Sequence, residues 1–428
     1  MLSQPEHSPG IDDGGIAMES VQTLSESQEL AEQDGAELRW NATGIRERLR
    51  TWRYTSPLIA FYGVHIAMTV FMLVITLYHH KHIGSVLTEW DGRWYEQIAR
   101  HGYSWHLTYN ADGSLGYSNL AFFPLLPLLM RAMTVVTDLK VEYTGILISW
   151  ICAAFAATGI YTLLSRYVSK KTALLAVILW AVVPPSYVES MDYTETMFTA
   201  FAVWALYALV QKKWLTSAIL IFFAGLTHST VVILVAVLAI AALVEIYHRR
   251  GDGLRALWRP AASILVAPSG FLVFLLYLWK HTGLWNAWFL AEQGGSWKAN
   301  FDFGDQALST LWRQFLWRDI DGIHFVPYLL ATAVIVPAIV CNISLLRRRL
   351  LPWEILLWTT MSVIFTMGSA GVYSSKPRFL LPIFPLLVPF AQELARRPRK
   401  TQIVAIAMLV IFGAWFGGYF LTYKFGPP

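Results

Sequence analysis

The chain has 428 residues, of which 56% are hydrophobic and only 14% are charged, and its mean hydropathy is +0.47. A soluble globular domain carries about 25% charged residues, so this composition excludes the soluble class and predicts an all-α integral membrane protein. The net charge is +5, and the basic residues lie in short clusters between apolar runs. This distribution excludes a nucleic-acid-binding face, which would gather the basic residues on one soluble surface. The two cysteines, Cys152 and Cys341, lie in separate apolar runs, so neither a disulfide framework nor a cysteine metal site is predicted.

The N-terminal segment, residues 1–44, is predicted to be a disordered acidic tail. Residues 1–40 hold nine acids against one base, and no basic segment followed by an apolar core is present there, so no cleaved signal peptide is expected. Four arginines between Arg46 and Arg53 precede the first apolar run, so the positive-inside rule predicts a cytoplasmic tail. The remainder, residues 45–428, is predicted to be the membrane domain.

Apolar runs long enough to cross a bilayer predict about eleven transmembrane helices. They fall at 57–78, 143–164, 172–188, 196–211, 215–228, 229–247, 261–280, 326–346, 354–371, 379–395 and 402–422. The segment Phe122–Val136 is interpreted as re-entrant or interfacial, because a full crossing there would move the basic cluster at Arg166–Lys171 to the wrong side. On this topology the outer face carries four loops, at about 79–120, 184–195, 281–325 and 372–378.

The first outer loop is predicted to carry the catalytic group. Asp91 follows the first membrane helix and is flanked by the candidate substrate-binding residues Trp90, Arg93 and Tyr95. A carboxylate in such surroundings can accept a hydrogen bond from a sugar hydroxyl or take its proton. The alternative is an interfacial aromatic belt with Asp91 as a helix cap.

A second acidic segment contributes four more candidate substrate-binding residues, Glu189, Asp192, Tyr193 and Glu195. Three carboxylates at a spacing of three would repel one another on one helix face, so part of the segment is expected to be a loop. Favourable contact with a helix N-terminus is an alternative that suits Glu195. A divalent cation would need more ligands than this segment supplies, so no metal site and no cofactor are predicted.

Three further residues are candidates for contact with the substrate. His228 is an ionisable group between two apolar runs, either functional or hydrogen-bonded within the helix bundle. Lys376 and Arg378 place two cations on an outer turn, where the positive-inside rule disfavours them, so a compensating anion such as a phosphate is expected. Attraction to anionic lipid headgroups is the alternative. The runs Gly294–Trp297 and Trp317–Gly322 are candidates for acceptor contact without a defined role.

These residues together resemble the PIG-V type GPI mannosyltransferases. The resemblance is carried by Trp90-Asp91 to Ile98-Ala99, His101-Gly102-Tyr103, Ala121-Phe122-Phe123-Pro124 to Pro127, Pro184-Pro185 to Tyr193-Thr194-Glu195 with Phe198, Arg378-Phe379 and Phe384-Pro385. It implies a GT-C type membrane glycosyltransferase that inverts the anomeric centre, with Asp91 as the catalytic group. His228 departs from the arginine usual in relatives, which shifts the expected phosphate contact to Arg378 and Lys376.

The implied activity is transfer of mannose, or a similar hexose, from a polyprenyl-phosphate sugar to an acceptor hydroxyl on the non-cytoplasmic side. The acidic tail and compact loops favour a bacterial relative in the inner membrane, whose acceptor would be a lipid, a glycan or a protein. Two other classes remain open: a transporter or flippase of lipid-linked sugars, and a non-catalytic scaffold subunit. The clustering of polar groups at one face favours the enzyme.

Overall fold

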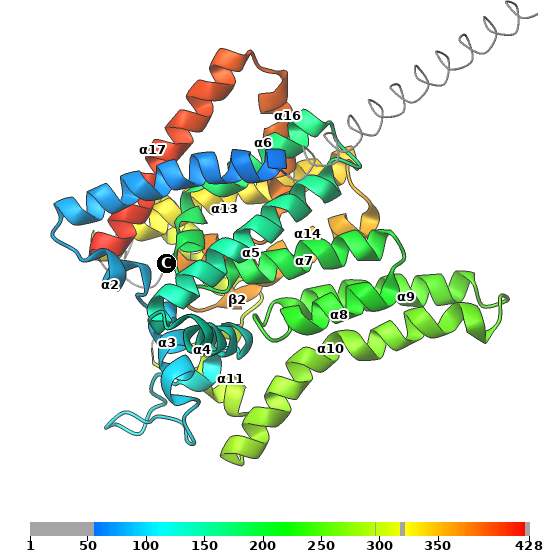
Figure 1. The fold of residues 1–428 in the computed structure, drawn as a ribbon, viewed down its shortest axis with the longest axis horizontal. Helices are drawn as coiled ribbons and strands as arrows, with labels where there is room; N and C mark the ends of the chain where they lie inside the picture. Colours follow the sequence, from blue (N-terminus) through cyan, green and yellow to red (C-terminus); the bar gives the residue numbers. More distant parts are fainter. Residues whose placement is uncertain (1–54, 296, 317–321, 424–428) are drawn as a thin grey trace, which may run out of the picture. The chain divides into compact units, whose positions relative to one another are not determined.

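The computed structural model describes residues 55–295, 297–316 and 322–423, with side chains for 326–422 of the last range. The predicted acidic tail lies outside the described residues, as do Ser296 and residues 317–321 of the predicted acceptor segments. From Pro57 onward the chain forms one compact unit, which is almost entirely helical (Figure 1).

Six of the described helices are long and apolar enough to cross a membrane. They are Thr55–Tyr78, α5 (Val141–Leu164), α9 (Val231–His248), α10 (Leu254–Thr282), Val326–Arg348 within α13 (Gly322–Arg348) and Arg399–Thr422 within α17 (Arg399–Tyr423). Each has at least 18 residues and a strongly apolar window. The prediction of a multi-pass, all-α membrane protein is therefore confirmed.

Two bent pairs raise the possible number of spans among the described residues to eight, and the predicted count of eleven is not confirmed. The pairs are α6 (Lys170–Val182) with the 3-10 helix η2 (Pro184–Ser190), bent by 76°, and Tyr373–Leu380 with Phe384–Arg396, bent by 82°. The second pair contains η3 (Tyr373–Ser375), α15 (Lys376–Leu380), η4 (Phe384–Leu387) and α16 (Val388–Arg396). Proline lies at both bends: Pro184 directly follows the first break, and Pro382 lies within the second. Proline cannot donate a backbone hydrogen bond and so interrupts a continuous helix.

Four shorter helices complete the bundle: α4 (Leu125–Thr137), α7 (Glu195–Val210), α8 (Trp214–Ala224) and α14 (Trp353–Gly368). The 13 residues of α4 extend only about 20 Å at 1.5 Å per residue, less than the hydrocarbon core of a bilayer. The segment 122–136, predicted as re-entrant or interfacial, therefore forms a helix too short to cross.

Helices α7, α8, α9 and α10 pack side by side in the green to yellow-green part of the ribbon (Figure 1). Glycine permits the closest of these approaches. A Cβ atom at Gly270 of α10 would lie 1.9 Å from the backbone oxygen of Phe222 in α8, and one at Gly225 would lie 2.8 Å from the backbone nitrogen of Phe271. Small residues allow membrane helices to pack at backbone contact in this way.

The connections at one end of the bundle form short helices and a small sheet. These elements are α2 (Ile83–Leu87), α3 (Asp91–His101), the 3-10 helix η1 (Asn119–Ala121), α11 (Ala287–Glu292), α12 (Asp305–Leu316), and strands β1 (Asn300–Phe301) and β2 (Ser369–Ala370). The strands pair antiparallel, with Asn300 opposite Ala370 and Phe301 opposite Ser369. They tie the α11–α12 connection to the end of α14, so segments distant in sequence meet at this end.

We expect Gly270→Ala to lower the free energy of unfolding by about 2 kcal/mol, because the added methyl group would overlap backbone and force α8 and α10 apart. Gly63→Ala is the matched control: Gly63 also lies in a membrane helix, and its Cβ would meet nothing within 4 Å. Thermal unfolding of the two variants in the same detergent measures the difference. Equal stabilities would show that the close α8–α10 contact is not maintained.

Candidate active site

The candidate site is centred on Arg378, the third residue of α15. Its Nη1 atom lies 2.6 Å from the Oδ2 atom of Asp91, at the start of α3, and its Nε atom lies 3.6 Å from the Oε1 atom of Glu195, at the start of α7. All three side chains are largely buried, with exposed side-chain fractions of 10%, 17% and 4% respectively. The structure therefore joins three segments that are separated by about a hundred residues or more.

The turn before α3 places Asp91 toward Arg378. Trp90 has a φ of 52°, in the left-handed region, and this redirects the chain into the helix. The Tyr193 hydroxyl donates to the Glu89 carbonyl oxygen at 3.3 Å and accepts from the Asp91 N–H at 3.4 Å. Asp91 is thus the first helical residue, with its backbone near a tyrosine and its side chain on an arginine, rather than a side-chain cap.

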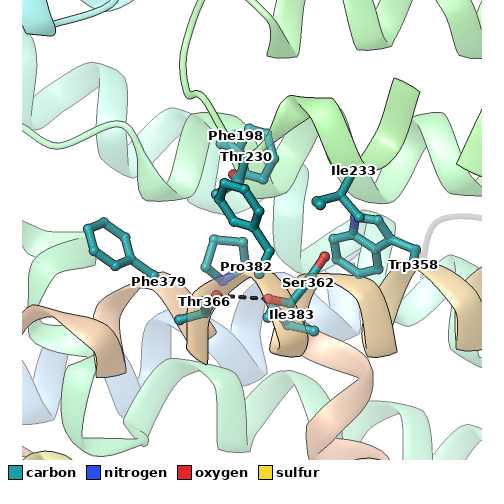
Figure 2. Close-up of a pocket in the computed structure, with 10 residues that line it drawn as sticks. Phe198, Thr230, Ile233, Trp358, Ser362, Thr366, Phe379, Pro382 and Ile383 are labelled. Carbon is teal, nitrogen blue, oxygen red and sulfur yellow. Dashed lines mark hydrogen bonds between the residues drawn. The ribbon is translucent and has the colours of Figure 1, made fainter. Parts of the chain in front are cut away.

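Two aromatic rings flank the guanidinium of Arg378. Its central carbon lies 5.2 Å from the centre of the Tyr193 ring and 4.8 Å from that of Phe379. Phe379 also borders a second, very small cavity of about 10 Å³, whose lining includes Phe198, Ile233 and Trp358 (Figure 2). This mostly apolar packing beside Arg378 limits water, which strengthens the attraction between Arg378 and its two carboxylates.

A cavity of about 560 Å³ opens beside the Asp91–Arg378 pair. Its charged and polar lining comes from α3, the α8–α9 turn, α11, β2 and α15, and its aromatic lining comes mainly from 122–123, α11 and 297–301. The lining residues include Asp91, Tyr95, His228, Trp288, Glu292, Trp297, Lys376 and Arg378. A cavity of this size, mainly apolar with a few convergent polar groups, has the character of a small-molecule site.

His228, Lys376 and Tyr95 also reach this cavity. The His228 Nδ1 atom lies 3.0 Å from the Thr230 hydroxyl, and its ring contacts Phe379. The Lys376 ammonium donates to the carbonyl oxygens of Thr366, at 3.0 Å, and Ser369. Its charge is therefore held beside the cavity by backbone groups.

Tyr193 and Glu195 contact Arg378 without lining the cavity. Trp90 and Arg93 do not line it either. Trp90 packs against the main hydrophobic core, and Arg93 forms an ion pair with Glu89 while its side chain stays 62% exposed. Neither side chain reaches the cavity in this conformation.

Glu189 and Asp192 lie in the protein interior, away from the cavity lining. The segment predicted to be an outer turn forms the buried helix η2 and the residues after it, and Glu189 lies 3.8 Å from the Nδ1 atom of His65. Asp192 packs against Gly92 and Gly145, and burial raises its pKa well above the usual value. Among the three acids of this segment only Glu195 joins Arg378, because the bend at η2 turns the other two into the core.

Sequence reasoning missed Glu292, the last residue of α11. Glu292 lines the cavity, and burial together with the nearby negative charge of Asp91 raises its pKa to about 8, against an opposing effect of Arg378. In the sequence Glu292 is an acid close to aromatic residues in a predicted outer loop, which is the same pattern that singled out Asp91. The two carboxyl groups lie 201 positions apart in the chain, so no local pattern connected them.

Within the part of the chain that the structure describes, no group of three His, Cys, Asp or Glu side chains is arranged to hold a metal ion. Asp91 and Glu195 are engaged with Arg378 instead.

No protein-family model matches the sequence, and no curated protein matches it. Among solved structures the chain is similar to ArnT from Cupriavidus metallidurans bound to undecaprenyl phosphate, with a TM-score of 0.46 and 12% identity, covering 81% of this chain and 63% of that chain. It is also similar to the Archaeoglobus fulgidus oligosaccharyltransferase tethered with an acceptor peptide, with a TM-score of 0.42 and 14% identity, covering 88% and 56%. The chain thus spans less than two thirds of either structure's length. The resemblance to the PIG-V type family stays a prediction.

We expect Arg378→Met to lower the free energy of unfolding by about 3 kcal/mol, because it leaves Asp91 and Glu195 largely buried without their cation. The triple variant Asp91→Asn, Glu195→Gln, Arg378→Met should recover most of that loss, since it removes the unbalanced charges. Arg396→Met, at a side chain that is 68% exposed, is the control with little change expected. Denaturant unfolding that gave the single and triple variants equal stability would contradict the ion-pair interpretation.

Glu292 should make the protein less stable as pH rises from about 5 to 8. Its pKa of about 8 in the folded state lies above the ordinary value of 4.5, so the folded chain binds more protons than the unfolded chain across this window. The stability that the protonated Glu292 carboxyl contributes is fully present below pH 4.5 and is lost as the pH rises past about 8. Glu292→Gln should show a shallower decline of melting temperature than the natural chain, and parallel curves would exclude the raised pKa.

Proposed function

We propose that the protein is a GT-C type membrane glycosyltransferase that moves mannose, or a similar hexose, from a polyprenyl-phosphate sugar to an acceptor hydroxyl with inversion. The observation that carries this proposal is the contact between Asp91 and Arg378 at a cavity of about 560 Å³ lined by aromatic and polar residues. One group can take a proton and the other can hold a phosphate, and they lie at the same cavity. The resemblance of the motifs around both residues to the PIG-V type family supports the donor.

Arg378 is the proposed phosphate-binding group. A guanidinium can bind two phosphate oxygens at once, and the pairing with Glu195 and the flanking rings hold it in place. The donor phosphate would take over part of the bonding that Asp91 now supplies. As the sugar–oxygen bond breaks, the leaving polyprenyl phosphate gains negative charge, which Arg378 and the ammonium of Lys376 stabilise.

Asp91 is the proposed general base. Its carboxylate accepts the proton of the acceptor hydroxyl while the acceptor oxygen forms a bond to the anomeric carbon, and the bond from that carbon to the phosphate oxygen breaks on the opposite face. The electron pair of the broken bond leaves with the phosphate. Because the acceptor attacks opposite the leaving group, the configuration at the anomeric carbon is inverted.

Tyr193 and Glu195 have positioning roles in this proposal, whereas His228 is a further candidate for contact with the substrate. Tyr193 fixes the backbone around Asp91 and Glu195 holds the guanidinium, so both act through the residues they contact. His228 borders the cavity beside Phe379 and would contact the phosphate or the sugar. The apolar lining would receive the first part of the polyprenyl chain.

The proposed setting is the outer face of a bacterial inner membrane, with the N-terminus in the cytoplasm. The acceptor would be a membrane lipid, a glycan or a protein. Basic clusters at the opposite ends of the helices support this orientation: Arg249 and Arg250 follow α9 and α13 ends in Arg347 and Arg348, whereas the turn before α9 lines the cavity.

We expect Asp91→Asn to lower transfer at least 100-fold, the lower range for loss of a general base, and Arg378→Ala to lower it comparably. Purified protein in liposomes is incubated with radiolabelled polyprenyl-phosphate mannose and a membrane extract as acceptor source, and products are identified by mass spectrometry. Asp112→Asn and Arg396→Ala, both at exposed positions, are the controls.

Near-normal transfer by Asp91→Asn would eliminate the proposed base. Movement of intact donor across the liposome membrane without any sugar-bearing product would instead identify a flippase.

A further inference from the structure

Helix α11 is fixed against the loop that carries Asp91. The Trp288 indole donates to the Ala121 carbonyl oxygen at 3.2 Å, and the Gly295 N–H donates to the Leu115 carbonyl oxygen at 2.9 Å. A Cβ atom at Gly294 would lie only 2.1 Å from the Gly116 oxygen, so backbone meets backbone there. These contacts give Glu292 a defined position at the cavity, although it lies far from Asp91 in sequence.

Two tryptophans accompany Glu292 at the cavity. Trp288 lies one helical turn before it, and Trp297 follows five residues later. Trp297 is held by edge contacts with Trp94, Tyr117 and Phe122, at ring-centre distances of 5.9, 4.9 and 5.5 Å. A rigid aromatic surface beside a hydrogen-bonding group suits a pyranose, which presents both C–H faces and hydroxyl groups.

The charges facing Glu292 favour its neutral form. Asp91 of α3 and burial disfavour ionisation, and Arg378 of α15 opposes them without cancelling them, so the pKa stays at about 8. Asp91 is the group already paired with the cation. A protonated carboxyl can donate one hydrogen bond and accept others, which is the pattern that a sugar hydroxyl can match.

We propose that Glu292, with Trp288 and Trp297, binds the sugar ring of the donor and so distinguishes a sugar-bearing polyprenyl phosphate from the bare polyprenyl phosphate. This inference rests on the proposed function, because it assigns the phosphate to Arg378 and the sugar to the α11 side of the same cavity. Glu292 is a substrate-binding residue in this assignment and takes no proton from the acceptor.

The test measures equilibrium binding of polyprenyl-phosphate mannose and of polyprenyl phosphate to the full chain in detergent. Glu292→Ala should weaken binding of the sugar-bearing lipid about tenfold, as expected for one buried hydrogen bond, and leave binding of the bare lipid unchanged. Glu292→Gln, which keeps a donor and an acceptor, should retain most of the affinity. Arg378→Ala should weaken both lipids, and Glu393→Gln, at an exposed position on α16, is the control.

Equal weakening of both lipids by Glu292→Ala, or no weakening of either, would overturn the assignment. If the alanine variant does not fold, Glu292→Gln and Glu292→Asp decide: the aspartate variant, with its shorter reach, should lose the preference for the sugar-bearing lipid that the glutamine variant keeps. Transfer by the natural chain is measured in parallel. Absence of transfer with the lipid preference intact would contradict the proposed enzyme and leave the sugar site supported.

Discussion

The paired charges around Arg378 constrain everything else at the cavity. A guanidinium that is only 10% exposed must retain its countercharges, because removing an ion from water without a partner costs several kcal/mol. Asp91 and Glu195 supply them from the starts of α3 and α7, so three segments distant in sequence must meet for any one of them to be stable. The ion pairs therefore fix the relative positions of α3, α7 and α15, and the cavity takes its shape beside them.

Irregular backbone collects where these segments meet, and the membrane setting explains why. In lipid a helix satisfies its own backbone groups, so breaks are tolerated only where protein or a cavity surrounds them. The bends at η2 and before η4, and the short strands β1 and β2, satisfy that condition among buried residues or beside the cavity. Carbonyl groups released near β2 bind the Lys376 ammonium, so an interruption of the helix contributes directly to the site.

Local chemistry made Asp91 and Arg378 predictable, because each is a charged group in an unfavourable place: an acid among aromatic residues and a cation on a turn predicted to lie at the outer face, where cations are scarce. The contact between Asp91 and Arg378 could be inferred only from the rule that buried charges are paired with opposite charges. The same reasoning failed to separate Glu195 from Glu189 and Asp192, because the bend at η2, which decides which acid reaches Arg378, depends on packing by distant helices.

The number of membrane spans could not be predicted from the sequence either. Residues 196–211 and 215–228 are apolar, but they form helices of only 16 and 11 residues. Glu292 is also an acid close to aromatic residues in the sequence. Only the contact between α11 and the first loop in the folded chain places it at the cavity beside Asp91.

The protonation state of Glu292 is what makes the two halves of the cavity compatible. Arg378 lies against both Asp91 and Glu195, and in the proposed function a donor phosphate enters by sharing Arg378. An ionised Glu292 would add a negative charge to this cavity and oppose that phosphate, because Coulomb repulsion is strong where water is scarce. A pKa of about 8 keeps the group neutral near pH 7, so it can hold a hydroxyl without competing for the cation. Burial and the nearby charge of Asp91 together raise the pKa of Glu292, so in the proposed function one cavity contains both Asp91 as the base and a Glu292 carboxyl that donates a hydrogen bond.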